Sequence, residues 1–222
     1  RSKMLLIKNF ARKTFSKKIR NFFGFFPSTD LIDYTSKNIS TSDAFFWRTD
    51  NSFQTIFKFT NILNYFYEVK NSNIKLIFFN KNNEFIKEFN IYTENNSHEV
   101  LINKSFLNNI SDYGSFYVFH ETKDQINTII RNSCYAGYSW KKNIPSMVHG
   151  NTISAQKKFD SKFIDYGVGG YSYFKKRSYK IQNQLTSEKT EIMLINPTKK
   201  EISVNVNNNI FKLKKGFLKL IT

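Results

Sequence analysis

The sequence predicts an all-β body of antiparallel strands, sandwich-like in architecture, that follows an amphipathic α-helix at the N-terminus. From Ala44 onward, short aromatic and β-branched runs alternate with clusters of Asn, Asp, Gly and Ser, a pattern typical of strands and turns. In the first 26 residues, apolar side chains instead recur every three or four positions, which is the period of a helix. We therefore expect a helix over residues 1–27, a polar linker over 28–42 and a β body over 43–222.

The β body divides into short strands whose hydrophobic patterns differ. Ile202, Val204 and Val206 alternate with polar residues, so this strand is expected to have one face in solvent. Leu76–Phe79 is apolar without a break, which favours a central position buried on both faces. Asn-rich turns at 80–83 and 207–209 indicate hairpins, because Asn tolerates the left-handed conformation. The expected strands span 53–59, 74–79, 84–92, 99–102, 115–120, 134–140, 171–181, 190–195, 201–206 and 210–213.

An internal similarity leaves two interpretations of the β body open. The phrase FKFTNIL at 57–63 resembles YKIQNQL at 179–185, and each precedes an apolar strand that ends in Asn. A duplication would give two related halves, 43–125 and 126–222. The alternative is a single sandwich that contains two similar hairpins, since hairpins reuse the same turn chemistry.

The N-terminal helix is expected to be apolar on one face and basic on the other. Eight basic residues precede the first acidic one, Asp30, and Pro27 ends the helix. This pattern is typical of a helix lying in a membrane interface, and it predicts an anionic membrane surface as partner. There are two alternatives: the helix packs on the body or on an upstream domain, or the segment is a mitochondrial transit peptide. The expected membrane-surface residues are Lys8, Arg12, Phe15, Lys17, Ile19, Phe22, Phe23 and Phe26.

Composition narrows the class of protein. The formal charge of +17 arises from 34 basic and 17 acidic residues, but only six of the basic residues are Arg, the side chain that phosphate readers favour. Nucleic-acid binding is therefore a weaker interpretation than membrane attachment. The single cysteine excludes an intrachain disulfide, and no apolar run is long enough to span a membrane. We expect a cytoplasmic protein, peripheral at the inner membrane face; its oligomeric state does not follow from the sequence.

The segment from 112 to 177 contains the candidate binding residues. Five of the eight glycines lie between Gly137 and Gly170, and loops of this composition on β scaffolds often carry sites. Tyr135, Tyr138, Trp140, Tyr171 and Tyr173 form either an aromatic platform for a sugar or base, or part of the core. The two histidines in this segment are either structural or pH-sensitive groups. The ligand-binding candidates are His120, Arg131, Tyr138, Trp140, His149, Asn151 and Arg177.

Catalytic and metal-binding motifs are absent from the sequence. The spacing of His98, His120 and His149 does not match a zinc site, so we expect no metal and no cofactor. Cys134 is either a thiol paired with His120 or His149, or a small buried residue. No nucleophile elbow, phosphate loop or metalloprotease helix is present. These features favour a binding protein and assign no catalytic residue.

Three phrases, SDAFFWR at 42–48, DYGSFYVFH at 112–120 and VHGN at 148–151, resemble uncharacterised bacterial proteins that accompany surface-polysaccharide biosynthesis. The resemblance spans most of residues 42–200 and implies a glycan, or a glycan-assembly enzyme, as partner. With the helix, it predicts a non-catalytic binding or accessory module that is peripherally attached to the membrane. The alternatives are a small enzyme acting on a sugar or nucleotide-sugar through His120, Arg131 and His149, and a nucleic-acid-binding β protein.

Overall fold

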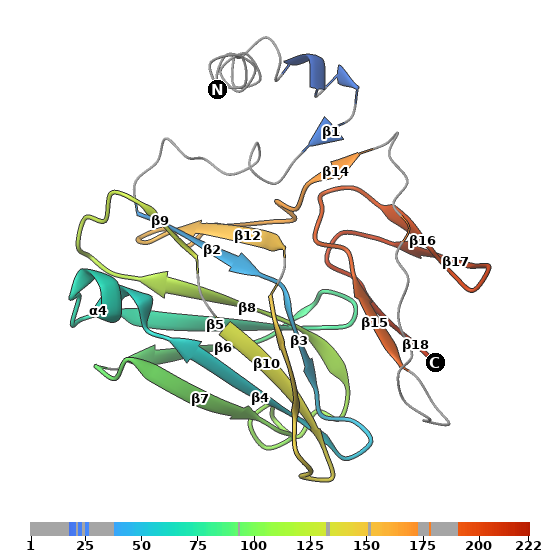
Figure 1. Ribbon diagram of the computed structural model, residues 1–222, viewed down its shortest axis with the longest axis horizontal. Helices are drawn as coiled ribbons and strands as arrows, with labels where there is room; N and C mark the ends of the chain where they lie inside the picture. Colours follow the sequence, from blue (N-terminus) through green and yellow to red (C-terminus); the bar gives the residue numbers. More distant parts are fainter. Residues whose placement is uncertain are drawn as a thin grey trace, which may run out of the picture.

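The protein is mostly β, with its strands arranged in several sheets that are largely antiparallel (Figure 1). This computed structural model describes residues 18–20, 22–23, 25–26, 38–92, 94–131, 134–150, 152–172, 178 and 191–222. The prediction of a mainly β protein with antiparallel sheets is confirmed. A short helix, α4 (Ile62–Tyr67), begins with an N-cap at Asn61, whose side chain accepts a hydrogen bond from the backbone N–H of Asn64.

Three four-stranded sheets form the body. Sheet I has the order β3 (Phe45–Arg48), β8 (Tyr113–Glu121), β5 (Asn73–Asn80) and β6 (Phe85–Tyr92). Sheet II has the order β11 (Ser146–His149), β10 (Cys134–Trp140), β4 (Phe53–Thr60) and β7 (Ser97–Ile102). Sheet III has the order β13 (Ile164–Tyr166), β12 (Ile153–Lys158), β2 (Ile39–Asp43) and β9 (Ile129–Arg131), and its β2–β9 pair is parallel.

Sheet I is the middle layer of the body. Leu76 and Phe78 on one face of β5 pack in a cluster with Phe57 of sheet II. Ile77, from the other face of β5, packs in a second cluster with Ala155 of sheet III. Successive side chains of a strand point to opposite faces, so a strand between two layers must be apolar at every position. The predicted central position of Leu76–Phe79 is confirmed.

The chain passes from sheet III to sheet I at Ala44, between β2 and β3. The hydroxyls of Ser42 and Ser40 accept hydrogen bonds of 2.8 and 2.9 Å from the backbone N–H groups of Val118 and His120 in β8. Strand β3 pairs with β8 only over residues 113–116, so the serine hydroxyls supply acceptors to the part of β8 that follows. Residues 39–42 therefore form a buried strand where we expected linker.

The C-terminal unit, residues 192–222, consists of two antiparallel two-stranded sheets, of which only β16–β17 is a hairpin. Strand β15 (Ile192–Ile195) pairs with β18 (Leu218–Ile221), and β16 (Ile202–Val206) pairs with β17 (Asn209–Leu213). Val204 and its neighbours alternate between half-buried and exposed, which confirms the predicted wet face. Asn207 and Asn208 have φ values of 49° and 67°, and Asn83 has 61°, so the Asn-rich turns use the left-handed conformation as expected.

The possible halves, 43–125 and 126–222, do not form separate sheets. Sheet II combines β4 and β7 from 43–125 with β10 and β11 from 126–222. Sheet III likewise combines β2 with β9, β12 and β13. The body is thus built from strands of both segments, and a domain boundary near residue 125 would cut through two sheets.

The N-terminal segment is helical over 18–20 and at Phe22, and the N–H of Phe23 donates to the carbonyl of Ile19 at 3.1 Å. The helix does not continue to residue 27, because Phe25–Phe26 form β1, which pairs with β14 (Tyr171–Ser172). Aromatic residues favour strands, which is consistent with the helix ending before Phe25. Lys8, Arg12, Phe15 and Lys17 lie outside the described residues. In the part of the chain that is described, no helix is both long and apolar enough to cross a membrane.

Candidate binding site

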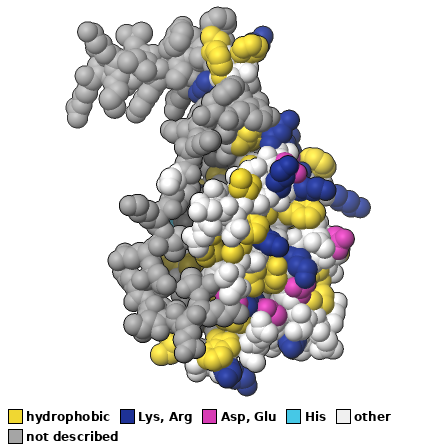
Figure 2. Space-filling view, turned by 90° about the vertical axis from the view of Figure 1, so that its right-hand side faces the viewer, with side chains coloured by type: hydrophobic (Ala, Val, Ile, Leu, Met, Phe, Trp, Pro, Cys, Tyr) yellow, Lys and Arg dark blue, Asp and Glu magenta, His cyan; other side chains and the backbone are white. Residues whose placement is uncertain are grey.

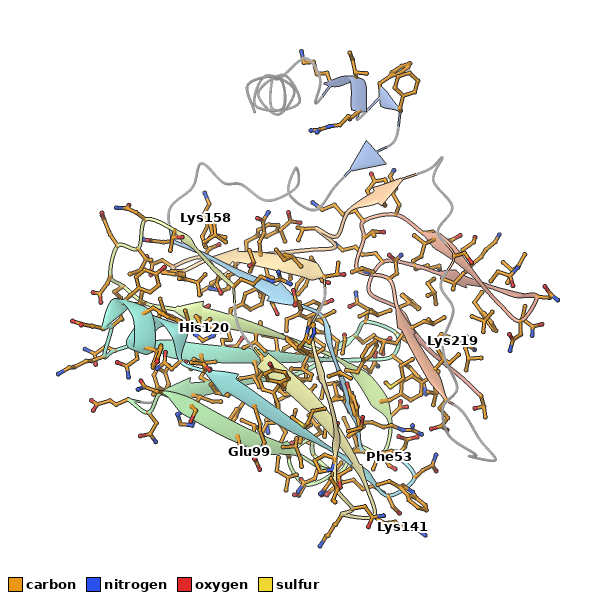
Figure 3. All side chains as sticks on the ribbon, viewed as in Figure 1. Phe53, Glu99, His120, Lys141, Lys158 and Lys219 are labelled. Atoms are coloured by element: carbon orange, nitrogen blue, oxygen red, sulfur yellow. The ribbon has the colours of Figure 1, made fainter. Side chains whose placement is uncertain are left out.

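The residues predicted to form a site are divided by the structure. His120 lies in β8 and is fully buried within the body (Figure 3). The Tyr138 ring points into the body, where its hydroxyl donates to the carbonyl of Phe46 at 3.2 Å. Both are structural positions in the core. Asn151 and Arg177 lie outside the described residues.

Trp140 lies at the far end of β10 from Cys134. Its Nε1–H donates to the carbonyl of Asn51 at 3.1 Å, and the ammonium of Lys141 lies 4.3 Å from its ring centroid. Trp140 lies five positions along the strand from Tyr135, which corresponds to roughly 17 Å between their Cα atoms. Trp140 therefore does not join a platform with Tyr135, and Figure 3 shows Lys141 at the extremity of the body.

The remaining two candidates, Arg131 and His149, stand at the ends of strands that reach a buried carboxylate, that of Asp43. Arg131 ends β9, and its Nη2 lies 3.1 and 3.0 Å from the two carboxylate oxygens of Asp43, at the end of β2. The Asp43 side chain is only 4% exposed, whereas that of Arg131 is 47% exposed. A buried anion thus fixes one end of a guanidinium whose other end reaches solvent, and partial burial strengthens such a pair.

Gly150 brings the end of β11, next to His149, to the same carboxylate. A side chain at Gly150 would place its Cβ within 2.6 Å of the Asp43 Cβ, and closer still to an oxygen of that carboxylate. Only a residue without a Cβ allows the end of β11 to lie against Asp43. His149, the preceding residue, is opposite Tyr135 in the β10–β11 register, and the two rings meet edge to face with centroids 6.4 Å apart. The Tyr135 side chain is exposed, at 52% for the residue.

Cys134 lies on the inner side of sheet II, where its thiol is close enough to Asp43 to feel the charge of that carboxylate. The thiol is buried, and burial, with a smaller contribution from the Asp43 charge, raises its pKa well above the ordinary value. A thiol is nucleophilic as the thiolate, which this environment disfavours. The interpretation of Cys134 as a small buried residue therefore fits its surroundings.

The anion-anchored site, as we call Asp43, Arg131, Tyr135 and His149, has the groups of a ligand-binding surface. Among the described residues, the Nε–H and Nη1–H donors of Arg131 have no acceptor. Asp43 holds the guanidinium that carries these donors and lies against Gly150, the residue after His149. The imidazole of His149 meets the half-exposed ring of Tyr135. An arginine of this kind offers a planar fork to a carboxylate, a phosphate or sugar hydroxyls.

A second charged cluster lies between sheets I and III and has a structural arrangement. The ammonium of Lys157 is buried and lies 2.5 Å from a carboxylate oxygen of Glu121. Lys75 lies 2.8 Å from Glu88 and 4.0 Å from Glu121. Two positive and two negative charges therefore compensate one another, three of them inside the body and Glu88 at its surface. Within the described residues, no group of three or more His, Cys, Asp or Glu side chains is placed to hold a metal ion.

Sequence reasoning found Arg131 and His149 but not the residue that unites them. Asp43 stands in the polar run ISTSD at 39–43, which has no strand-like hydrophobic pattern. Its partner is 88 residues away, so the pair depends on the parallel register of β2 with β9. No protein-family model matches the chain, and neither the curated proteins nor the solved structures include a significant match. The site therefore rests on its geometry alone.

Proposed function

We propose that the chain is a non-catalytic binding or accessory module of bacterial surface-glycan assembly, with a sandwich-like β body that binds a glycan at the anion-anchored site. The observation that carries this proposal is the half-exposed Arg131, held by buried Asp43, together with the Tyr135–His149 pair of β10 and β11, whose end at Gly150 lies against Asp43. The module attaches through its N-terminal segment to the anionic, cytoplasmic face of the membrane.

A sugar ring matches the chemistry of the anion-anchored site. The exposed face of Tyr135 offers an apolar surface for the C–H groups of a pyranose, while the Arg131 donors that have no acceptor among the described residues offer hydrogen bonds to oxygen atoms at its edge. A carboxylate on the sugar adds a charge-assisted hydrogen bond. Two phrases that resemble polysaccharide-associated proteins supply Asp43, His149 and Gly150 of this region, which supports the glycan context.

Calorimetric titration with oligosaccharides tests the glycan part of the proposal. We expect the full chain to bind a uronic-acid hexasaccharide more tightly than a neutral glucan hexasaccharide, because only the former pairs with Arg131. Arg131→Ala and Tyr135→Ala should each weaken binding by about tenfold or more, the scale of a lost charged or aromatic anchor. Lys142→Ala and Tyr92→Ala, which remove an exposed cation and an exposed ring elsewhere, serve as controls. Equal binding by Arg131→Ala and the unaltered chain would contradict the proposal.

Membrane attachment is supported by exposed aromatic side chains in the N-terminal segment. Phe22 is 85% exposed, Phe23 and Ile19 are also exposed, and Lys18 is adjacent to them in sequence. Bulky apolar groups next to cations partition into the headgroup region of an anionic bilayer. This arrangement suits the reversible attachment of a peripheral protein.

Vesicle co-sedimentation tests the attachment. The full chain should sediment with vesicles of equal parts phosphatidylglycerol and phosphatidylcholine, and not with phosphatidylcholine alone. Phe22→Ser combined with Phe23→Ser should reduce the bound fraction strongly, because two apolar anchors are lost. Phe85→Ser combined with Tyr92→Ser removes two rings of similar exposure from β6 and should leave binding unchanged. A loss of equal size in both double variants would argue against the N-terminal segment as the anchor.

A further inference from the structure

The positive charge of the chain is distributed unevenly. The body, residues 38–172, has 14 basic and 12 acidic residues and is therefore almost neutral. The C-terminal unit, residues 192–222, has six lysines and a single acidic residue, Glu201. A charge excess concentrated in a small unit produces a local field that a neutral body does not dilute.

The lysines of the C-terminal unit are exposed and mostly not neutralised. Among the described residues, only Lys199 has a carboxylate partner, Asp165, at 2.9 Å. The ammonium groups of Lys214 and Lys219 instead lie 6.0 Å from the ring centroids of Phe217 and Phe211. The other lysines of the unit are Lys200, Lys212 and Lys215.

An apolar side chain accompanies these charges. Ile210 in β17 is 68% exposed. It precedes Lys212 by two residues, so both side chains lie on the same face of the β16–β17 hairpin, opposite Asn205 and Ser203 of β16. Figure 2 faces the side of the molecule on which β15–β18 lie, and the side chains coloured there are a mixture of Lys and Arg, hydrophobic residues and a few acidic residues.

The C-terminal unit lies close to the N-terminal segment. Strand β1, which follows the exposed Phe22 and Phe23, pairs with β14 at Tyr171 and Ser172. Two residues before β14, the N–H of Gly169 donates to the carbonyl of Pro197 at 2.9 Å, at the base of the C-terminal unit. Gly169 has no side chain to prevent this approach, since a Cβ there would meet the same carbonyl oxygen at 2.5 Å. Residues 169–172 thereby link β1, which follows Phe22 and Phe23, to the base of the C-terminal unit.

We propose that the C-terminal unit is a second surface for anionic phospholipid, which acts together with the N-terminal segment; this inference rests on the proposed membrane attachment. The unit contains six Lys and no Arg, and point charges suit a diffuse layer of headgroups better than the bidentate contacts of nucleic-acid readers. The exposed Ile210 suits a bilayer interface and has no role on a phosphate backbone.

Charge-neutral variants of the full chain test the second surface. Lys212→Gln, Lys214→Gln and Lys219→Gln together should weaken binding to equal parts phosphatidylglycerol and phosphatidylcholine by at least about tenfold, given the contribution of each cation near an anionic leaflet. The matched control is Lys70→Gln, Lys104→Gln and Lys142→Gln, which removes the same charge from exposed positions on the body and should have little effect. Thermal unfolding verifies that both triple variants are folded.

The outcomes separate the second surface from the attachment itself. If the C-terminal triple variant binds vesicles as the unaltered chain does, while Phe22→Ser with Phe23→Ser abolishes binding, the second surface is refuted and the attachment stands. If the unaltered chain binds no anionic vesicle, both proposals fail. If the chain binds single-stranded poly(U) RNA and no vesicle, and the same triple variant loses that binding, the surface is a nucleic-acid interface and the lipid proposal is overturned. Loss in the C-terminal variant alone supports the lipid surface.

Discussion

Two glycines show how the cost of one methyl group depends on the atoms around it. A Cβ at Gly114 in β8 would collide with the carbonyl oxygen of Phe79 and approach Nε1 of Trp47 to 2.6 Å. Those two groups form a 2.8 Å hydrogen bond with each other in the core. A Cβ at Gly137 would collide instead with Sδ of Met147, the flexible end of a side chain on an edge strand.

We therefore predict that Gly114→Ala destabilises the protein by about 3 kcal/mol or more, since it displaces backbone and breaks a buried hydrogen bond. Gly137→Ala should cost less than about 1 kcal/mol, because Met adapts to its surroundings. Urea unfolding of the two variants measures the difference. Equal losses of the free energy of unfolding would show that the backbone at Gly114 yields as readily as the Met147 side chain.

The charge cluster of Lys75, Glu88, Glu121 and Lys157, which extends from the interior to the surface at Glu88, predicts a pH dependence. Burial acts to raise the pKa of Glu88, but the hydrogen bond and charge of Lys75 outweigh it, so the pKa is lowered in the folded state. A carboxyl whose pKa is lowered on folding stabilises the protein above its unfolded value of about 4.3 and loses that contribution as the pH falls through the folded value. Glu88→Gln should thus flatten the acid side of the stability curve, measured by urea unfolding between about pH 3 and 6. Glu84→Gln is the matched control.

At the scale of single residues, the sequence shows which polar side chains could bind a ligand, but it does not show which residues surround them in the fold. Arg131 and His149 stand out as polar residues in a Gly-rich segment, and the structure places both near Asp43. His120 and Tyr138 have the same polar character, yet both point into the core. The direction of a side chain follows from the pairing of distant strands, which local patterns do not contain.

At the scale of elements, β2 depends on serine hydroxyls rather than on apolar side chains. Ser40 and Ser42 are buried and accept the N–H groups of His120 and Val118. Replacing both by Ala should destabilise the protein by about 2–4 kcal/mol, because two buried N–H groups lose their acceptors. Amide hydrogen exchange should accelerate at Val118 and His120 more than at Leu76 in the neighbouring strand. Ser203→Ala, on the exposed face of β16, should leave exchange and stability unchanged.

Strand β2 also shows which kind of strand cannot be predicted from the sequence. Strands β4, β5 and β10 coincide closely with the predicted runs, because aromatic and β-branched residues mark them. The run ISTSD of β2 has no apolar period, and its burial becomes favourable only when β8, β9 and β12 surround it. A buried polar strand is therefore invisible to hydrophobic periodicity.

On the scale of the whole molecule, the order of layers was only partly predictable. The unbroken apolar run Leu76–Phe79 indicates a strand between two layers, and β5 has that position. The switch of the chain from sheet III to sheet I at Ala44 has no local signal, because Ala tolerates strands, turns and bends alike. Which strands share a sheet is decided by how the apolar faces of distant segments match.

The C-terminal unit joins the body through a buried arginine. The guanidinium of Arg48 in β3 donates to Asp50 at 2.6 Å and to Glu191, the residue before β15, at 2.5 Å. It also lies 4.0 Å from the centroid of the Phe53 ring, and the Arg48 side chain is almost fully buried. Removal of the Glu191 charge leaves this cation with a single carboxylate, so one end of the attachment becomes weaker.

Glu191→Gln should therefore destabilise the protein by about 1–2 kcal/mol, since a partly buried charged hydrogen bond becomes a neutral one. Hydrogen exchange resolved by mass spectrometry should show faster exchange in peptides from 192–222, with little change in β4 and β10. Glu201→Gln removes an equal charge from an exposed position of the same unit and should change neither. If the two variants behave alike, the Arg48 contact does not hold the C-terminal unit. The basic surface would then be positioned on the body by the backbone hydrogen bonds at Pro197 and Lys81.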